Sequence, residues 1–340
     1  MPPASPTRLL IFAVLLPAVV AGTNQWIYDA IPTHDSLQTW LHPWMAFTTA
    51  VLSWCSGRHL LNAWIRWIVF AWCLVLLDLL TLAATQDNRI PDHFGYLLVS
   101  SQISLLVIWA VLGAVSWQWR LPAVLAVSPL VIGFSGAISG SWWGQAWNVT
   151  MIFATVAVAL VSVWLRWRGF RLERPKAKAP SNDEIESMAA NQFGIKHMLV
   201  WATAIVPLLL LLRGIDFLVL GGVQDLESAF AATAVASSLA TVNLVAIWAV
   251  LGGGLPIVRI ALLLVMPPLF ATALVYYSKY IGAKYGPTWP NVPMLDAIYS
   301  MHDYWVVWLW SDAALLAALL LFLRACGYRL LSRNRATTAS

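Results

Sequence analysis

The sequence predicts an all-α, polytopic integral membrane protein with about ten transmembrane helices and a parallel internal repeat of four helices. Hydrophobic residues make up 60% of the 340 residues and charged residues only 10%, and the mean hydropathy is +0.74. Soluble domains carry about 25% charged residues, so a water-soluble core of this size is excluded. Two further observations lead to the fold class: the chain contains apolar stretches of spanning length, and it matches itself.

Ten stretches are apolar over roughly the 20 residues that a helix needs to cross a bilayer. The first stretch also fits a cleaved signal peptide, because Leu9–Val20 follows Arg8 and precedes the small residues Ala21 and Gly22. Cleavage there would leave nine helices. The predicted spans are 9–24, 38–55, 60–83, 96–117, 121–140, 147–165, 198–220, 230–251, 257–278 and 305–323.

The distribution of positive charge predicts the orientation of these helices. Lys and Arg are enriched in the cytoplasmic loops of membrane proteins. With the N-terminus inside, fifteen of the twenty Lys and Arg fall on the inner side, and only Arg89, Lys279 and Lys284 fall in outer loops. We therefore expect a protein of the cell inner (cytoplasmic) membrane with both termini in the cytoplasm.

The internal repeat places residues 58–172 over residues 196–330. The segment from Ile108 to Gly113 recurs identically from Ile247 to Gly252, and this separation is called the short offset. Leu165-Arg166 and Gly169-Phe170-Arg171-Leu172 recur as Leu323-Arg324 and Gly327-Tyr328-Arg329-Leu330, and this separation is called the long offset. Because each unit has four spans, both units enter from the same side, and an axis along the membrane normal relates them.

These patterns divide the chain into five segments. Two N-terminal spans occupy residues 1–57, and residues 58–172 form the first four-helix unit. An inner linker of residues 173–195 leads to the second unit, residues 196–330. A basic inner tail, 331–340, ends the chain.

Three charged residues at membrane depth form the candidate polar path. Asp78 and Asp216 occupy matching places in the two units, and Arg213 lies on the same predicted helix as Asp216, one turn earlier. A charged residue at the centre of a transmembrane helix makes membrane insertion less favourable by about 2.5–3.5 kcal/mol. Arg213 can offset this cost for Asp216, because the two residues lie on one face of the helix. Asp78 has no such neighbour and needs a partner from another helix, from water or from a proton. Asp312 is a further charged residue within a predicted span. The alternative is that Asp78 and Asp216 lie near the headgroups and are solvated.

A second candidate set lies in the predicted outer loops, where histidine and aspartate are neighbours. Imidazole beside carboxylate can bind a divalent metal or act in acid–base catalysis. Neither His-x-x-x-His nor Glu-x-x-His spacing occurs among them, so no metal and no cofactor is predicted, and solvated loop residues are the alternative. The set comprises His34-Asp35, Asp92-His93 and His302-Asp303.

One segment carries a resemblance. Gln192-Phe193-Gly194-Ile195-Lys196 leads into an apolar helix that ends in Leu211-Leu212-Arg213. This resembles a Gln-Phe-Ser-Ile-Arg-like turn in uncharacterised bacterial multipass inner-membrane proteins, from which Gly194 and Lys196 depart. The resemblance covers only the segment from Asn191 to Arg213. It implies a bacterial inner membrane and carries no assigned activity.

Three classes of function fit these observations. The leading hypothesis is a membrane protein that binds or transports a small solute or ion through a polar path between the two repeated halves. The second is an enzyme on the outer face acting on a lipid-linked or envelope substrate, and the third is a structural or assembly component. The basic residues lie at the ends of apolar segments and not on a shared face, so the lipid bilayer and not nucleic acid is the expected partner.

Overall fold

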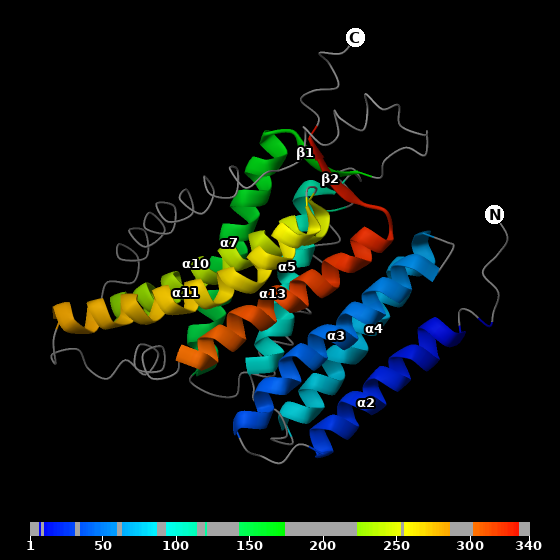
Figure 1. The fold of residues 1–340 in the computed structure, drawn as a ribbon, viewed down its shortest axis with the longest axis horizontal. Coiled ribbons are helices and arrows are strands. Elements are labelled where there is room, and N and C mark those ends of the chain that lie inside the picture. Colours follow the sequence, from blue (N-terminus) through cyan, green and yellow to red (C-terminus); the bar gives the residue numbers. More distant parts are fainter. Residues whose placement is uncertain are drawn as a thin grey trace, which may run out of the picture.

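The computed structural model describes residues 7, 10–30, 35–59, 63–86, 93–113, 120, 143–173, 223–252, 255–285 and 302–332. These residues are mostly helical (Figure 1). Four of the described helices are long and apolar enough to cross a membrane, as expected for a helical membrane protein. Their apolar windows are Gly95–Leu112, Thr233–Leu251, Pro256–Tyr277 and Trp305–Ala325.

Every predicted span that falls within the described residues corresponds to a helix. Two predicted spans, 121–140 and 198–220, lie outside those residues, so the expected number of ten helices stays a prediction. The described elements are η1 (Ile11–Leu15), α2 (Leu16–Ala30), α3 (Asp35–His59), α4 (Ala63–Gln86), α5 (His93–Leu112), α7 (Trp143–Trp167), β1 (Phe170–Glu173), α10 (Val223–Leu251), α11 (Pro256–Tyr285), α13 (His302–Ala325) and β2 (Arg329–Ser332).

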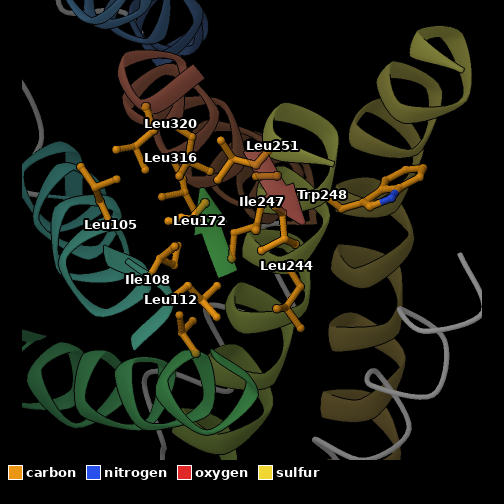
Figure 2. Close-up of a cluster of buried hydrophobic side chains, with 14 of the residues drawn as sticks. Leu105, Ile108, Leu112, Leu172, Leu244, Ile247, Trp248, Leu251, Leu316 and Leu320 are labelled. Atoms are coloured by element: carbon orange, nitrogen blue, oxygen red, sulfur yellow. The ribbon is translucent and has the colours of Figure 1, made fainter. Parts of the chain in front are cut away.

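Helices α5, α7, α10 and α13 pack against one another, and two large clusters of buried apolar side chains lie along them. The N-side cluster joins the N-terminal halves of these helices, with Leu98 from α5 and Leu309 from α13 among its members. The C-side cluster joins their C-terminal halves and includes Ile108, Ile247 and Leu319. Figure 2 shows side chains of α5, α10 and α13 converging in the C-side cluster, where Leu172 of β1 joins them. The helices therefore run in the same direction.

Helices α4 and α11 run in the opposite direction. The N-terminal half of α4 contributes Phe70 to the C-side cluster, and its C-terminal half contributes Leu77 to the N-side cluster. In α11, Met266 packs against the C-side cluster and Leu274 belongs to the N-side cluster. Helices α4 and α5, and likewise α10 and α11, which follow each other in the chain, therefore run in opposite directions.

A two-stranded antiparallel ribbon lies at the end of the bundle beside the C-side cluster (Figure 1). Its strands, β1 and β2, follow α7 and α13 after the turns at Gly169 and Gly327. Both glycines have a φ of 87°, a backbone conformation that glycine adopts without the steric cost of a side chain. Leu172 is paired with Leu330 in this ribbon, and both are buried. These two residues match each other at the long offset of the sequence repeat.

Matching contacts also occur at the short offset. The N–H of Gly113 donates to the carbonyl of Trp109 at 3.0 Å, and that of Gly252 donates to the carbonyl of Trp248 at 2.9 Å. Arginines follow the same pattern, since Arg120 donates to the carbonyl of Ala110 and Arg259 to that of Ala249. The ends of α5 and α10 therefore have the same local structure.

Two consecutive prolines lie within α11, and a neighbouring helix compensates for one of them. Because Pro268 has no N–H, the carbonyl of Leu264 loses its partner four residues along the helix. The indole N–H of Trp310 in α13 donates to this carbonyl at 3.0 Å. Packing of α11 against α13 thus satisfies a polar group that would otherwise face an apolar environment.

Candidate functional site

The carboxyl group of Asp312 is completely buried in α13, with an exposed fraction of 0%. Ser100 and Ser101 of α5 and Asn243 of α10 place their polar groups against it. The hydroxyl oxygen of Ser101 lies 3.4 Å from Oδ1 of Asp312 and 2.9 Å from the carbonyl oxygen of Leu97. A hydroxyl group has one hydrogen to donate, so Ser101 donates chiefly to Leu97, and Oδ1 of Asp312 is its more distant acceptor.

Asn243 connects α10 to α5 beside this carboxyl group. Its Nδ2 donates to the hydroxyl oxygen of Ser104 at 3.3 Å, and its side chain is completely buried. Two buried oxygen atoms of this group of residues, Oδ1 of Asn243 and Oδ2 of Asp312, have no hydrogen-bond donor within the described part of the chain. Asn243 is also a hydrogen-bond partner of the carboxyl group of Asp312, so the two side chains are neighbours.

Asp78 of α4 has a partner from another helix, as its isolation on α4 requires. Nε2 of Gln102 in α5 donates to Oδ1 of Asp78 at 2.7 Å. Asp78 is half-buried, whereas Gln102 is buried. Because Gln102 directly follows Ser101 in the sequence, one turn of α5 contacts both carboxyl groups.

These residues form a polar layer between the two apolar clusters. On α5, Val99 belongs to the N-side cluster and Leu105 to the C-side cluster. On α10, Val242 and Leu244 flank Asn243 in the same way. The layer is therefore inside the bundle and not at its ends. The polar layer comprises Asp78, Ser100, Ser101, Gln102, Ser104, Asn243 and Asp312.

The described partners of the Asp312 carboxyl group are neutral polar side chains. The interactions of Asp312 with described residues are with hydroxyl groups and an amide, and none is with a cationic side chain. An ionised carboxylate without such a partner is strongly unfavourable at membrane depth. Hydroxyl, amide and carboxylate oxygens are suitable ligands for a hard cation, and a proton would equally neutralise the carboxylate.

Most of the predicted site residues fall outside the described structure. Asp216, Arg213, Asp92 and His34 are not among the described residues, and the side chains of Asp35, His93, His302 and Asp303 are not described either. The backbone places His93 and His302 as the first residues of α5 and α13. Because these helices run in the same direction and share the N-side cluster, both histidines lie at that end of the bundle.

The sequence alone does not predict which residues meet at the centre of the layer. Asp312 stood out as a charge within a predicted span, but Ser101, Ser104 and Asn243 were not singled out. A signal was present, since Ser100-Ser101-Gln102 and Ser104 interrupt an otherwise apolar helix. Their convergence with α10 and α13 depends on how three distant helices rotate against one another, which the sequence does not specify.

Comparisons with known proteins give no further guide to the site. The chain matches no protein-family profile, no curated protein and no solved structure.

Proposed function

We propose that this protein binds a small cation or a proton in the polar layer, as part of the binding or transport of a small solute or ion between two repeated halves. The observation that carries the proposal is the completely buried carboxyl group of Asp312, whose partners among the described residues are the neutral side chains of Ser100, Ser101 and Asn243. A cation or a proton bound there would neutralise the carboxylate. Asp78, with Gln102, would extend the polar path to α4.

We also propose that the chain is internally duplicated, with the topology predicted from its sequence. Ser104 contacts Asn243, its match at the short offset, and Leu172 pairs with Leu330, its match at the long offset. Contacts between matching positions are expected on the axis of a two-fold repeat. Both contacts support an axis that runs along the helices, through the polar layer and the ribbon. Asp216 and Arg213 would then belong to the second copy of the α4 region.

The predicted orientation completes the proposal. The excess of Lys and Arg on one side supports an inner-membrane protein with cytoplasmic termini and with the ribbon on the cytoplasmic side. The N-side cluster would then face the outer leaflet, and the polar layer would be reached from either side only through the bundle.

The test is the melting temperature of the purified full-length protein in detergent. It is measured in sodium, potassium, lithium and choline chloride at equal ionic strength, and over a range of pH. A ligand that binds only the folded state stabilises it by about 2.7 kcal/mol at 100 times its Kd, and this amounts to several degrees. We expect one metal cation, or acidification, to raise the melting temperature of the wild type.

The variant Asp312→Asn should lose this response, because an amide neither ionises nor carries the negative charge. Ser311→Ala is the matched control: Ser311 is the buried neighbour of Asp312, and its hydroxyl donates to the carbonyl of Val307 at 2.6 Å, within its own helix. The control should keep the response. Equal responses of the wild type and Asp312→Asn to every cation and to pH would contradict the proposal.

A further inference from the structure

Two groups of arginines, with three members each, lie at the end of the bundle that carries the ribbon. Each member of one group matches a member of the other at the short or the long offset of the sequence repeat. The first arginine triad is Arg120, Arg166 and Arg171, and the second arginine triad is Arg259, Arg324 and Arg329.

The first arginine triad surrounds the C-terminal end of α5. Arg120 donates to the carbonyl of Ala110, and Nη1 of Arg166 donates to that of Val111 at 2.9 Å. Burial, followed by the charges of Arg166 and Arg171, lowers the pKa of Arg120. Three guanidinium groups therefore lie close enough to repel one another.

The second arginine triad has the same relation to α10. Nη1 of Arg259 donates to the carbonyls of Ala249 and Gly252, at 3.2 and 2.7 Å. The charges of Arg329 and Arg259 both act on Arg324. Each helix end is thus capped by arginine while further arginines stand beside it.

Capping of helix carbonyls explains only part of this arrangement. Arginine near a helix C-terminus is favourable because it pairs with the last carbonyl groups. A guanidinium group has five N–H donors, however, and the buried Nε atoms of Arg120, Arg171 and Arg259 have no acceptor among the described residues. The two strands contain one acidic residue, Glu173, at the position paired with Arg329. Among the described residues, positive charge and unused donors therefore remain in excess.

We propose that each arginine triad binds the phosphate group of an anionic lipid. The apolar windows of α5, α10 and α13 end at Leu112, Leu251 and Ala325, next to the triads, so the guanidinium groups lie at the depth of the lipid headgroups. Arginine recognises phosphate through paired N–H groups, and basic pockets between transmembrane helices bind anionic headgroups. This site is separate from the polar layer and goes beyond the function proposed above.

The test adds phosphatidylglycerol to the delipidated full-length protein in detergent. Native mass spectrometry then counts the lipid molecules that are bound. We expect two tightly bound molecules on the wild type. Arg171→Gln and Arg329→Gln should each weaken one of them by about ten-fold, since each removes a charge-assisted hydrogen bond, and the double variant should weaken both. Arg171→Lys, which keeps the charge, should retain more binding than Arg171→Gln.

Arg58→Gln is the matched control, because it removes the same charge at the end of α3, where Arg58 stacks over Trp54 at 5.5 Å. It should retain both lipids. Equal loss in Arg58→Gln would show a general effect of charge, and unchanged lipid in the double variant would exclude the triads; either result overturns the proposal. So would displacement of the lipid by inorganic phosphate at equal concentration, which would show a site for the free anion.

Discussion

Positions that match at the short or the long offset are alike at the ribbon end of the bundle but differ in the polar layer. At the ribbon end, matching positions carry the same residue types and contacts, as with Arg120 and Arg259. In the polar layer they do not. The position that matches Asp312 at the long offset is Ala154, and the position that matches Ser101 at the short offset is Ala240.

This difference indicates which constraints act on each region. Capping of a helix end is required at α5 and at α10, and the two ends make the same contacts. A completely buried carboxyl group occurs once in the layer, at Asp312, because a second one would be unfavourable; Asp78 is only half-buried and accepts a hydrogen bond from Gln102. We infer that the ribbon end maintains the shared architecture and that the polar layer holds the specialised chemistry.

The largest expected effect comes from Ala154→Asp, which copies Asp312 into the other half. Ala154 is buried in the N-side cluster, among apolar side chains. An unpaired charge there should lower the free energy of unfolding by at least about 3 kcal/mol. Unfolding in SDS, followed by tryptophan fluorescence, measures it. A fully stable variant would show that the two halves offer the same environment.

The next effect concerns the pair of leucines in the ribbon. Leu172→Ala and Leu330→Ala each remove a side chain that is about 1–2% exposed, and each should cost about 2–4 kcal/mol. Since the residues are paired, the double variant should cost less than the sum of the two. Additive effects in the same SDS titration would mean that the two strands do not stabilise each other.

Smaller and matched effects are expected at Gly113 and Gly252. A Cβ atom at either position would lie 2.5 Å from a carbonyl oxygen, that of Trp109 or of Trp248. Replacement by alanine should therefore cost about 1–3 kcal/mol in each case, because the backbone must shift. Melting temperatures in detergent would show whether the two variants lose the same stability. A large loss at one glycine only would mean that the ends of α5 and α10 differ in local structure.

The smallest effect is expected for Ser104→Ala in the polar layer. It removes the acceptor of the 3.3 Å hydrogen bond from Nδ2 of Asn243 and should cost about 1 kcal/mol. The melting temperature should fall slightly, while the response to the bound cation or proton should persist, because Asp312 and Asn243 remain. Loss of that response in Ser104→Ala would place the hydroxyl group of Ser104 within the site.

The hydropathy and charge patterns were sufficient to predict where helices occur. The predicted span 305–323 lies within α13, and 147–165 lies within α7. The ribbon was not predicted, because β1 pairs with a strand from the far end of the chain and neither short strand has a pattern of its own. The sequence match around Gly169 and Gly327 was the visible trace of the turns that begin both strands.

The candidate site was predicted less completely than the fold. The sequence showed that Asp78 lacked a partner on its own helix, but not that Gln102 supplies one. Burial of Asp312 depends on the packing of α13 against α3, α5, α10 and α11, which is a tertiary property. Local patterns reveal charges within spans, whereas the rotation of each helix decides which charges meet.

The most direct test of the central claim is cation flux into proteoliposomes that contain the full-length protein. Uptake of protons, reported by a pH-sensitive dye inside, and of radioactive sodium would be compared for the wild type, Asp312→Asn and Ser311→Ala. We expect uptake of one of these cations above that of empty liposomes for the wild type and Ser311→Ala, and its loss in Asp312→Asn. Equal uptake by all three proteins would contradict the claim that Asp312 forms the cation site.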